Sequence, residues 1–167
     1  MPFPRSLVIT ACAVMLACAS DAPTPSGPGA QNPPVGSPAP PSLDTEVAEF
    51  VGLVNEHRQS VGCGDLDWHT GAGDVADAHS ADMSARDFFS HTNPDGESPF
   101  DRLADAGITY RAAGENIALT GGGASGVLSL WLGSPGHRAN IERCGYTHHG
   151  VGLVDNLWTH LFLEDPS

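Results

Sequence analysis

Three residues of this sequence are the candidates to hold a metal ion or move a proton. His91 lies in the turn-rich segment 90–99, Glu115 begins a strand-like segment, and His137 begins a helical one. Two imidazoles can bind a divalent metal such as zinc, and a neighbouring carboxylate can act as general base on a bound water. Each residue alone is more often structural, so this chemistry requires that the fold bring the three together. We expect His91 and His137 to face each other across a cleft, with Glu115 within hydrogen-bond reach of one of them.

This set is small for a catalytic zinc site, which generally has three protein ligands, because only two histidines can be assigned. If Glu115 is the third ligand, no obvious base remains. Other hydrolase motifs do not fit: Ser134 lacks the glycine that a nucleophile elbow needs at residue 132, where this chain has leucine, and HExxH is absent. No cofactor is required by the sequence, and a divalent metal at His91 and His137 is expected to bind weakly.

The elements that must position these residues follow from hydrophobic periodicity and breakers. We expect helices at 43–61 (capped by Asp44), in the second half of 64–89, and at 99–107, 126–133 and 137–144. Strands are expected at 115–119, 147–154 and 157–164, the last two forming a hairpin around Asp155-Asn156. This order predicts an α/β fold with a small, mainly antiparallel sheet covered by helices.

Two further expectations concern His79 and the segment around His137. His79 shares a helix face with Val75 and Met83, which predicts a hydrogen-bonded core histidine. Pro135 and Gly136 stop one helix and start another, so the ring of His137 should project into a cleft. Its neighbour Arg138 should point away and pair with a carboxylate.

The first 42 residues are not expected to be part of the folded domain. Residues 1–19 resemble a secretory signal peptide, with Arg5 before the apolar run 7–17. Either Ala17-Cys18-Ala19 is cleaved to free Ser20, or MLAC makes Cys18 a lipidated anchor. Residues 20–42, in which eight prolines occur, are expected to be a disordered linker.

Residues 43–167 are long enough for one domain, and their charge restricts its partners. Acidic residues greatly outnumber basic ones, and the formal net charge of the chain is −13. Such a surface disfavours nucleic acid and anionic lipid, so the membrane is expected to be reached only through a lipid anchor. The two cysteines of the domain, Cys63 and Cys144, would usually pair in an exported protein, and the alternative is two buried free thiols.

Three segments, in this order and spacing, resemble the bacterial branch of the CAP superfamily of cysteine-rich secretory, venom-antigen and pathogenesis-related proteins. They are SHTNPDGESPFDRL (90–103), AAGENIA (112–118) and WLGSPGHRANI (131–141). The resemblance implies an α-β-α sandwich with a small sheet between helical layers and a concave cleft. It also implies a disulfide between Cys63 and Cys144, since bacterial relatives carry a cysteine pair at these positions.

Fuller members of this family line the cleft with two histidines and two acidic residues, which in some cases bind a divalent metal. The resemblance assigns His91, Glu115 and His137 to three of these positions and Ser134 to the fourth, where an acid is usual. It therefore implies an exported cell-envelope protein, expected to be a monomer, that recognises a lipid, glycan or protein through the cleft. The alternative is a metal-assisted hydrolase of an envelope peptide or ester. Localisation is expected to be either lipid-anchored or secreted.

Overall fold

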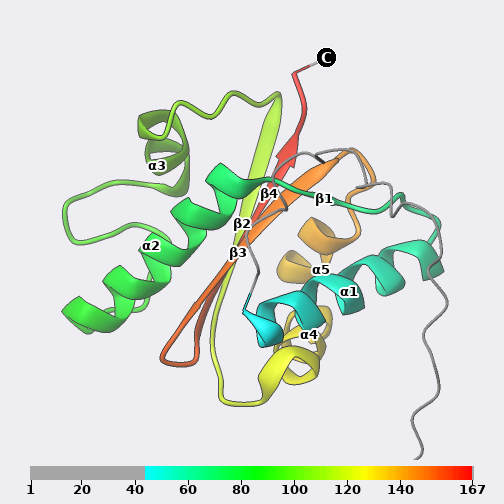
Figure 1. Cartoon of the computed structure of the whole chain (residues 1–167), viewed down its shortest axis with the longest axis horizontal. Helices are drawn as coiled ribbons and strands as arrows, with labels where there is room; N and C mark the ends of the chain where they lie inside the picture. Colours follow the sequence, from blue (N-terminus) through cyan, green and yellow to red (C-terminus); the bar gives the residue numbers. More distant parts are fainter. Residues whose placement is uncertain (1–43, 167) are drawn as a thin grey trace, which may run out of the picture. The chain divides into compact units, whose positions relative to one another are not determined.

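The computed structural model describes residues 44–166, so the expected signal peptide, the linker and Cys18 lie outside the described residues. Within 44–166 the helices are α1 (Thr45–Ser60), α2 (Thr70–Arg86), α3 (Pro99–Asp105), α4 (Gly123–Gly133) and α5 (Pro135–Ile141) (Figure 1). The strands are β1 (Asp67–Trp68), β2 (Ala112–Leu119), β3 (His148–Val154) and β4 (Leu157–Glu164). None of these helices is both long and apolar enough to cross a bilayer.

The four strands form one sheet in the order β1-β3-β4-β2. Both pairings of β4 are antiparallel, and the short β1 runs parallel to β3. The hairpin between β3 and β4 turns at Asp155 and Asn156, whose φ angles of 49° and 66° are those of a tight turn that follows the twist of the strands. The predicted α/β fold with a mainly antiparallel sheet is confirmed.

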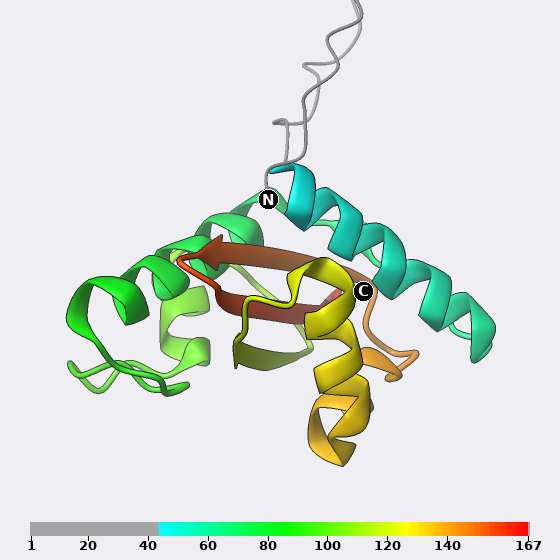
Figure 2. The same ribbon diagram turned by 90° about the horizontal axis from the view of Figure 1, so that it is seen from below.

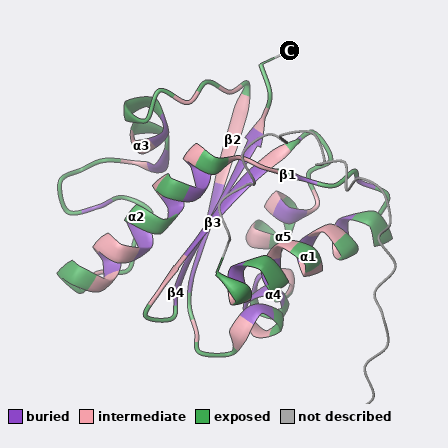
Figure 3. Cartoon of the chain, viewed as in Figure 1, coloured by how far each residue is buried: buried purple, intermediate pink, exposed green. Residues whose placement is uncertain are grey.

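Helices cover both faces of the sheet (Figure 2). Successive side chains of β4 therefore point into two different cores. Trp158 and Phe162 belong to the core under α1, α4 and α5, whereas Leu161 and Leu163 belong to the core under α2 and α3. The burial pattern of β4 is accordingly continuous, and only Glu164 is partly exposed (Figure 3). A strand buried on both faces is what a three-layer sandwich requires.

Helix α2 lies directly on β3 because two glycines of the strand have no side chain. A Cβ atom at Gly150 would lie 2.2 Å from the backbone of Ala72, and one at Gly152 would lie 2.2 Å from the backbone of Asp77. Any larger residue at either position would push α2 off the sheet. This close packing sets the position of α2 and of the loop that follows it.

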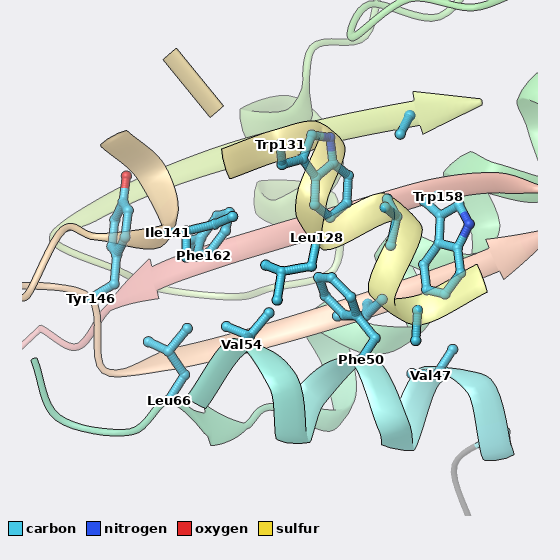
Figure 4. Close-up of a cluster of buried hydrophobic side chains, with 14 residues drawn as sticks. Val47, Phe50, Val54, Leu66, Leu128, Trp131, Ile141, Tyr146, Trp158 and Phe162 are labelled. Atoms are coloured by element: carbon cyan, nitrogen blue, oxygen red, sulfur yellow. The ribbon is translucent and has the colours of Figure 1, made fainter. Parts of the chain in front are cut away.

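The opposite core is centred on aromatic side chains and closed by a disulfide. The ring of Phe50 on α1 lies 5.5 Å from those of Trp131 and Trp158 (Figure 4). Cys63, after α1, is joined to Cys144, after α5, which confirms the predicted disulfide. Buried Arg58 completes this end of the core by donating hydrogen bonds to the backbone carbonyls of Gly64, Ile141, Arg143 and Tyr146.

The structure corrects several expected element bounds. The break between α4 and α5 falls at Ser134, with an extended ψ of 120°, and Pro135 begins α5 instead of separating two helices. Strand β2 begins at residue 112, three residues before the expected start, and β1 was not expected. The predicted ion pair of Arg138 is wrong: its Nε donates to the carbonyl of Leu132, 2.6 Å away, and thereby caps α4.

Candidate functional site

The carboxylate of Glu115 is the centre of the candidate site. Its side chain is only 2% exposed on β2, and each carboxylate oxygen has a strong partner. Oε1 lies 2.7 Å from Nδ1 of His91, and Oε2 accepts a hydrogen bond of 2.7 Å from Nη2 of Arg102. The expected contact between Glu115 and one of the two histidines is therefore present, and the buried charge of the glutamate is balanced by a guanidinium.

Arg102 was not predicted to belong to the site, although it lies within the motif SPFDRL. It sits in the last turn of α3, a helix that begins with Pro99 and a reciprocal cap between Ser98 and Asp101. Besides Glu115, the Arg102 guanidinium binds the carbonyls of His91 (3.0 Å) and Glu97 (3.1 Å) through Nη1. One side chain thus joins β2, α3 and the loop that carries His91.

The hydrogen bond to Glu115 determines which nitrogen of His91 is available. An ionised carboxylate only accepts hydrogen bonds, so Nδ1 of His91 must carry the proton. In the neutral ring Nε2 then has a free lone pair, and the side chain is 49% exposed. His91 is consequently oriented by a buried acid and presents one nitrogen outward, as metal-binding and catalytic histidines often do.

His79 supports the same loop from α2. Its ring is buried, and Nε2 lies 3.0 Å from the carbonyl of Ser90, the residue before His91. Burial, reinforced by the charge of Arg102, lowers the pKa of His79, so the neutral ring donates from Nε2 to that carbonyl. The prediction of a hydrogen-bonded core histidine is confirmed.

His137 reaches the site from the first turn of α5. Its carbonyl accepts a hydrogen bond of 3.0 Å from Asn116 on β2, and Asn140 donates to both Asn116 and the carbonyl of Glu115. Burial and then the nearby charge of His91 lower the pKa of His137, which keeps its ring neutral at pH 7. Its Nδ1 is buried without a hydrogen-bond partner in the described part of the chain, which leaves Nε2 as the nitrogen that could meet a ligand.

Ser134, the fourth expected cleft residue, links α4 to α5. Its carbonyl accepts the first hydrogen bond of α5, from the N–H of Arg138, while its hydroxyl does not cap the helix. A hydroxyl at this position carries no negative charge.

The donors at this site do not fit a tightly held catalytic metal. Across residues 44–166 no group of three or more His, Cys, Asp or Glu side chains is arranged to hold a metal ion. Glu115 uses both oxygens for Arg102 and His91, so it is not free to be a ligand or a general base. Two Nε2 atoms, of His91 and His137, are the donors that remain, whereas zinc normally takes at least three protein ligands.

A polar cavity adjoins the site on the α2 side of Arg102. Its volume is about 540 Å³, and its lining combines Arg86 and Arg102 with acidic side chains, Asn93 and the buried His79. Asn93 holds the loop in its turn, because its Oδ1 accepts from the backbone N–H groups of Asp95 and Glu97. The turn-rich segment 90–99 contains a turn at residues 93–96, closed by a hydrogen bond of 3.0 Å from the backbone N–H of Gly96 to the carbonyl of Asn93.

A three-layer sandwich that carries a histidine–glutamate site defines a class of protein, and comparison with known proteins identifies the family. Residues 51–157 match the CAP family, described as the cysteine-rich secretory protein family, and the chain belongs to it. It is 38% identical over 127 residues to the protein YkwD of Bacillus subtilis (strain 168), covering 75% of this chain. The matched region is 49% of YkwD, so this chain corresponds to about half the length of that relative.

Two solved structures have the same fold. One is an extracellular protein containing an SCP domain from Bacillus anthracis, with a TM-score of 0.69 and 34% identity. The match covers 71% of this chain and 40% of that one. The other, an outer surface protein from Borrelia burgdorferi, has a TM-score of 0.67 at 20% identity, covering 74% of this chain and 96% of that one, and so supports the fold alone.

Proposed function

We propose that this chain is an exported cell-envelope protein of the CAP family that acts as a binding module. Its ligand is a lipid, glycan or protein of the envelope, and it is recognised at the surface formed by His91, Glu115, His137 and Ser134. The protein acts as a monomer. It is either secreted or held at the membrane by a lipid on Cys18.

The observation that carries this proposal is the complete pairing of Glu115. A buried carboxylate that is bound by Arg102 and His91 can orient a ring but cannot activate water without breaking these bonds. The site therefore offers ring nitrogens of His91 and His137 and the hydroxyl of Ser134 for hydrogen bonds. These groups are better suited to binding a polar ligand than to catalysing its hydrolysis.

Export is supported by independent features. A disulfide joins Cys63 to Cys144, and such bonds persist in oxidising compartments. An apolar segment of secretory type precedes the domain. The structural neighbour from Bacillus anthracis, 34% identical to this chain, is an extracellular protein.

The second candidate function, a metal-assisted hydrolase of an envelope peptide or ester, is favoured by the oriented Nε2 of His91. It lacks a third metal ligand and a free base, for the reasons given above. Any divalent ion held by His91 and His137 alone would be bound weakly.

The two functions are separated by binding and turnover measured on the same variants. Wild type, His91→Ala and His137→Ala would be incubated with peptidoglycan sacculi, envelope lipid vesicles and detergent-solubilised envelope proteins, and bound protein would be quantified. His57→Ala is the matched control, since His57 pairs with Glu142 outside the site. We expect both site variants to lose retention on one of these fractions while the control keeps it.

Release of amine or acid products from peptide and ester substrates is followed in parallel, with and without added zinc. Catalytic turnover by wild type that disappears in His91→Ala would favour the hydrolase. The proposed binding surface would be rejected if both site variants bound all three envelope fractions as well as wild type does.

A further inference from the structure

Two strongly exposed apolar side chains meet at one hollow on the surface. Phe89, in the loop after α2, is 52% exposed, and Leu119, at the end of β2, is 60% exposed. Both line a cavity of about 380 Å³ together with Met83, Phe88 and Leu157. Exposed apolar residues that gather in a concave surface mark interaction sites, whereas scattered ones do not.

The floor of this apolar groove is buried, although its walls are exposed. Met83 and Leu157 are buried and belong to one core cluster with Ile117, against which Phe88 packs. Phe89 and Leu119 do not belong to that cluster, and both side chains are exposed. Their contribution to folding is therefore small, and their position over the groove is available for a partner.

Two aspartates, Asp87 and Asp155, form the rim of the groove. Asp155 accepts a hydrogen bond from the hydroxyl of Ser84, which holds its carboxylate at the rim. Both aspartates have left-handed backbones, with φ angles of 52° and 49°, a conformation that aspartate adopts more readily than most residues. Within residues 44–166 no basic side chain is among the residues that line the groove. Arg86, which stacks on Phe88, pairs with Asp82 and Asp95 instead.

We propose that this groove docks a segment of a partner protein in which an apolar side chain is flanked by lysine or arginine. The apolar side chain fills the space between Phe89 and Leu119, and the basic residues face Asp87 and Asp155. A second copy of this chain is disfavoured, because the chain carries a net charge of −13. The same rim repels anionic lipid headgroups.

The groove shares no residue with the candidate site, but it lies next to it. Phe89 precedes His91 by two residues, and Leu119 follows Glu115 by four residues on the same face of β2. A partner in the groove would therefore lie beside the ligand surface. This inference goes beyond the proposed function and does not depend on it.

The test is selection of peptides from a random nonapeptide library displayed on phage against the purified full chain, followed by titration of synthetic copies of the enriched peptides. We expect these peptides to carry an aromatic or aliphatic residue within two positions of lysine or arginine. Phe89→Ser and Leu119→Ser should each weaken binding about tenfold, since each removes a large apolar contact. Asp87→Asn should weaken it about threefold and reduce its salt dependence.

Leu130→Ser is the matched control, because Leu130 is 51% exposed on α4 outside the groove. It should bind as wild type does, and circular dichroism should show that all variants are folded. The proposal is overturned if no peptide is enriched, if the enriched peptides lack basic residues, or if Phe89→Ser binds as tightly as wild type. It is also overturned if Phe89 and Leu119 are needed for binding phosphatidylglycerol vesicles and not for binding peptides.

Discussion

Lowering the pH from 7.5 to 5 should strongly destabilise the folded domain, because two neutral histidines lie in its core. His149 on β3 and His160 on β4 are fully buried, and Nδ1 of His149 lies 3.1 Å from Nε2 of His160. The remaining nitrogen of each ring has no hydrogen-bond partner within the described chain. Burial, with the charge of Arg58 adding to it, lowers the pKa of His149 to about 4, and burial holds that of His160 well below its usual range.

The sign and size follow from proton binding in the two states. In the unfolded chain both rings titrate near pH 6.5, so below that pH the unfolded state binds more protons and stability falls. For His149 the loss is about 2 kcal/mol at pH 5 and about 3 kcal/mol once the pH passes below 4, at about 1.4 kcal/mol per pKa unit. His160 adds a loss of the same sign, so the pair loses more than the about 2 kcal/mol of His149 alone at pH 5, a large part of a typical domain stability.

Urea unfolding followed by tryptophan fluorescence at both pH values measures this loss, with the disulfide left intact. The variant His149→Gln keeps a polar side chain that cannot take up a proton. Its stability should fall between pH 7.5 and 5 by about 2 kcal/mol less than that of wild type. Equal losses in the two proteins, at equal denaturant slopes, would refute the assignment of the pH dependence to this pair.

Three further predictions concern the disulfide, the metal and the anchor. Cys63→Ser should lower the melting temperature, because opening a loop of 81 residues costs at most about 4.5 kcal/mol of stability. Peptide mapping of wild type without reductant should recover Cys63 linked to Cys144. Calorimetric titration of wild type with zinc should give a micromolar or weaker Kd. His137→Ala should abolish zinc binding and Ser134→Glu should strengthen it, whereas tight binding by wild type would reveal a further ligand. Cys18→Ser should release the protein from membranes, unless the native protein is already soluble and begins at Ser20.

Much of the fold could be predicted from the sequence, because its elements have strong local signals. Phe50 and Val54 recur at helical spacing in α1, and the alternation of β3 and β4 predicted their hairpin. Strand β1 has two residues, too few to show any alternation. The start of β2 was missed because residues 112–114 are alanine, alanine and glycine, which are strand residues only through pairing with β4.

The site was predicted less completely than the fold. The positions of His91, Glu115 and His137 came from ordered motifs, and a contact of Glu115 with one of the two histidines was expected. The role of Arg102 could not be read from its spacing, because it depends on how α3 lies against β2. The apolar groove involves Leu119 and Phe89, which are far apart in the chain and which only the packing of α2 on the sheet brings together.

Arg102 also changes what the site can bind. A buried glutamate needs a compensating positive charge, and in a metal site the ion itself can supply it. Here the guanidinium of Arg102 already neutralises Glu115 at 2.7 Å, so a divalent ion beside His91 would meet a cation with no unpaired acid to offset it. Ser134, which the family resemblance aligns with a second acid, carries no charge. The groups left for a ligand are then Nε2 of His91 and the ring of His137, and such ring nitrogens favour a ligand that forms hydrogen bonds through hydroxyl or amide groups.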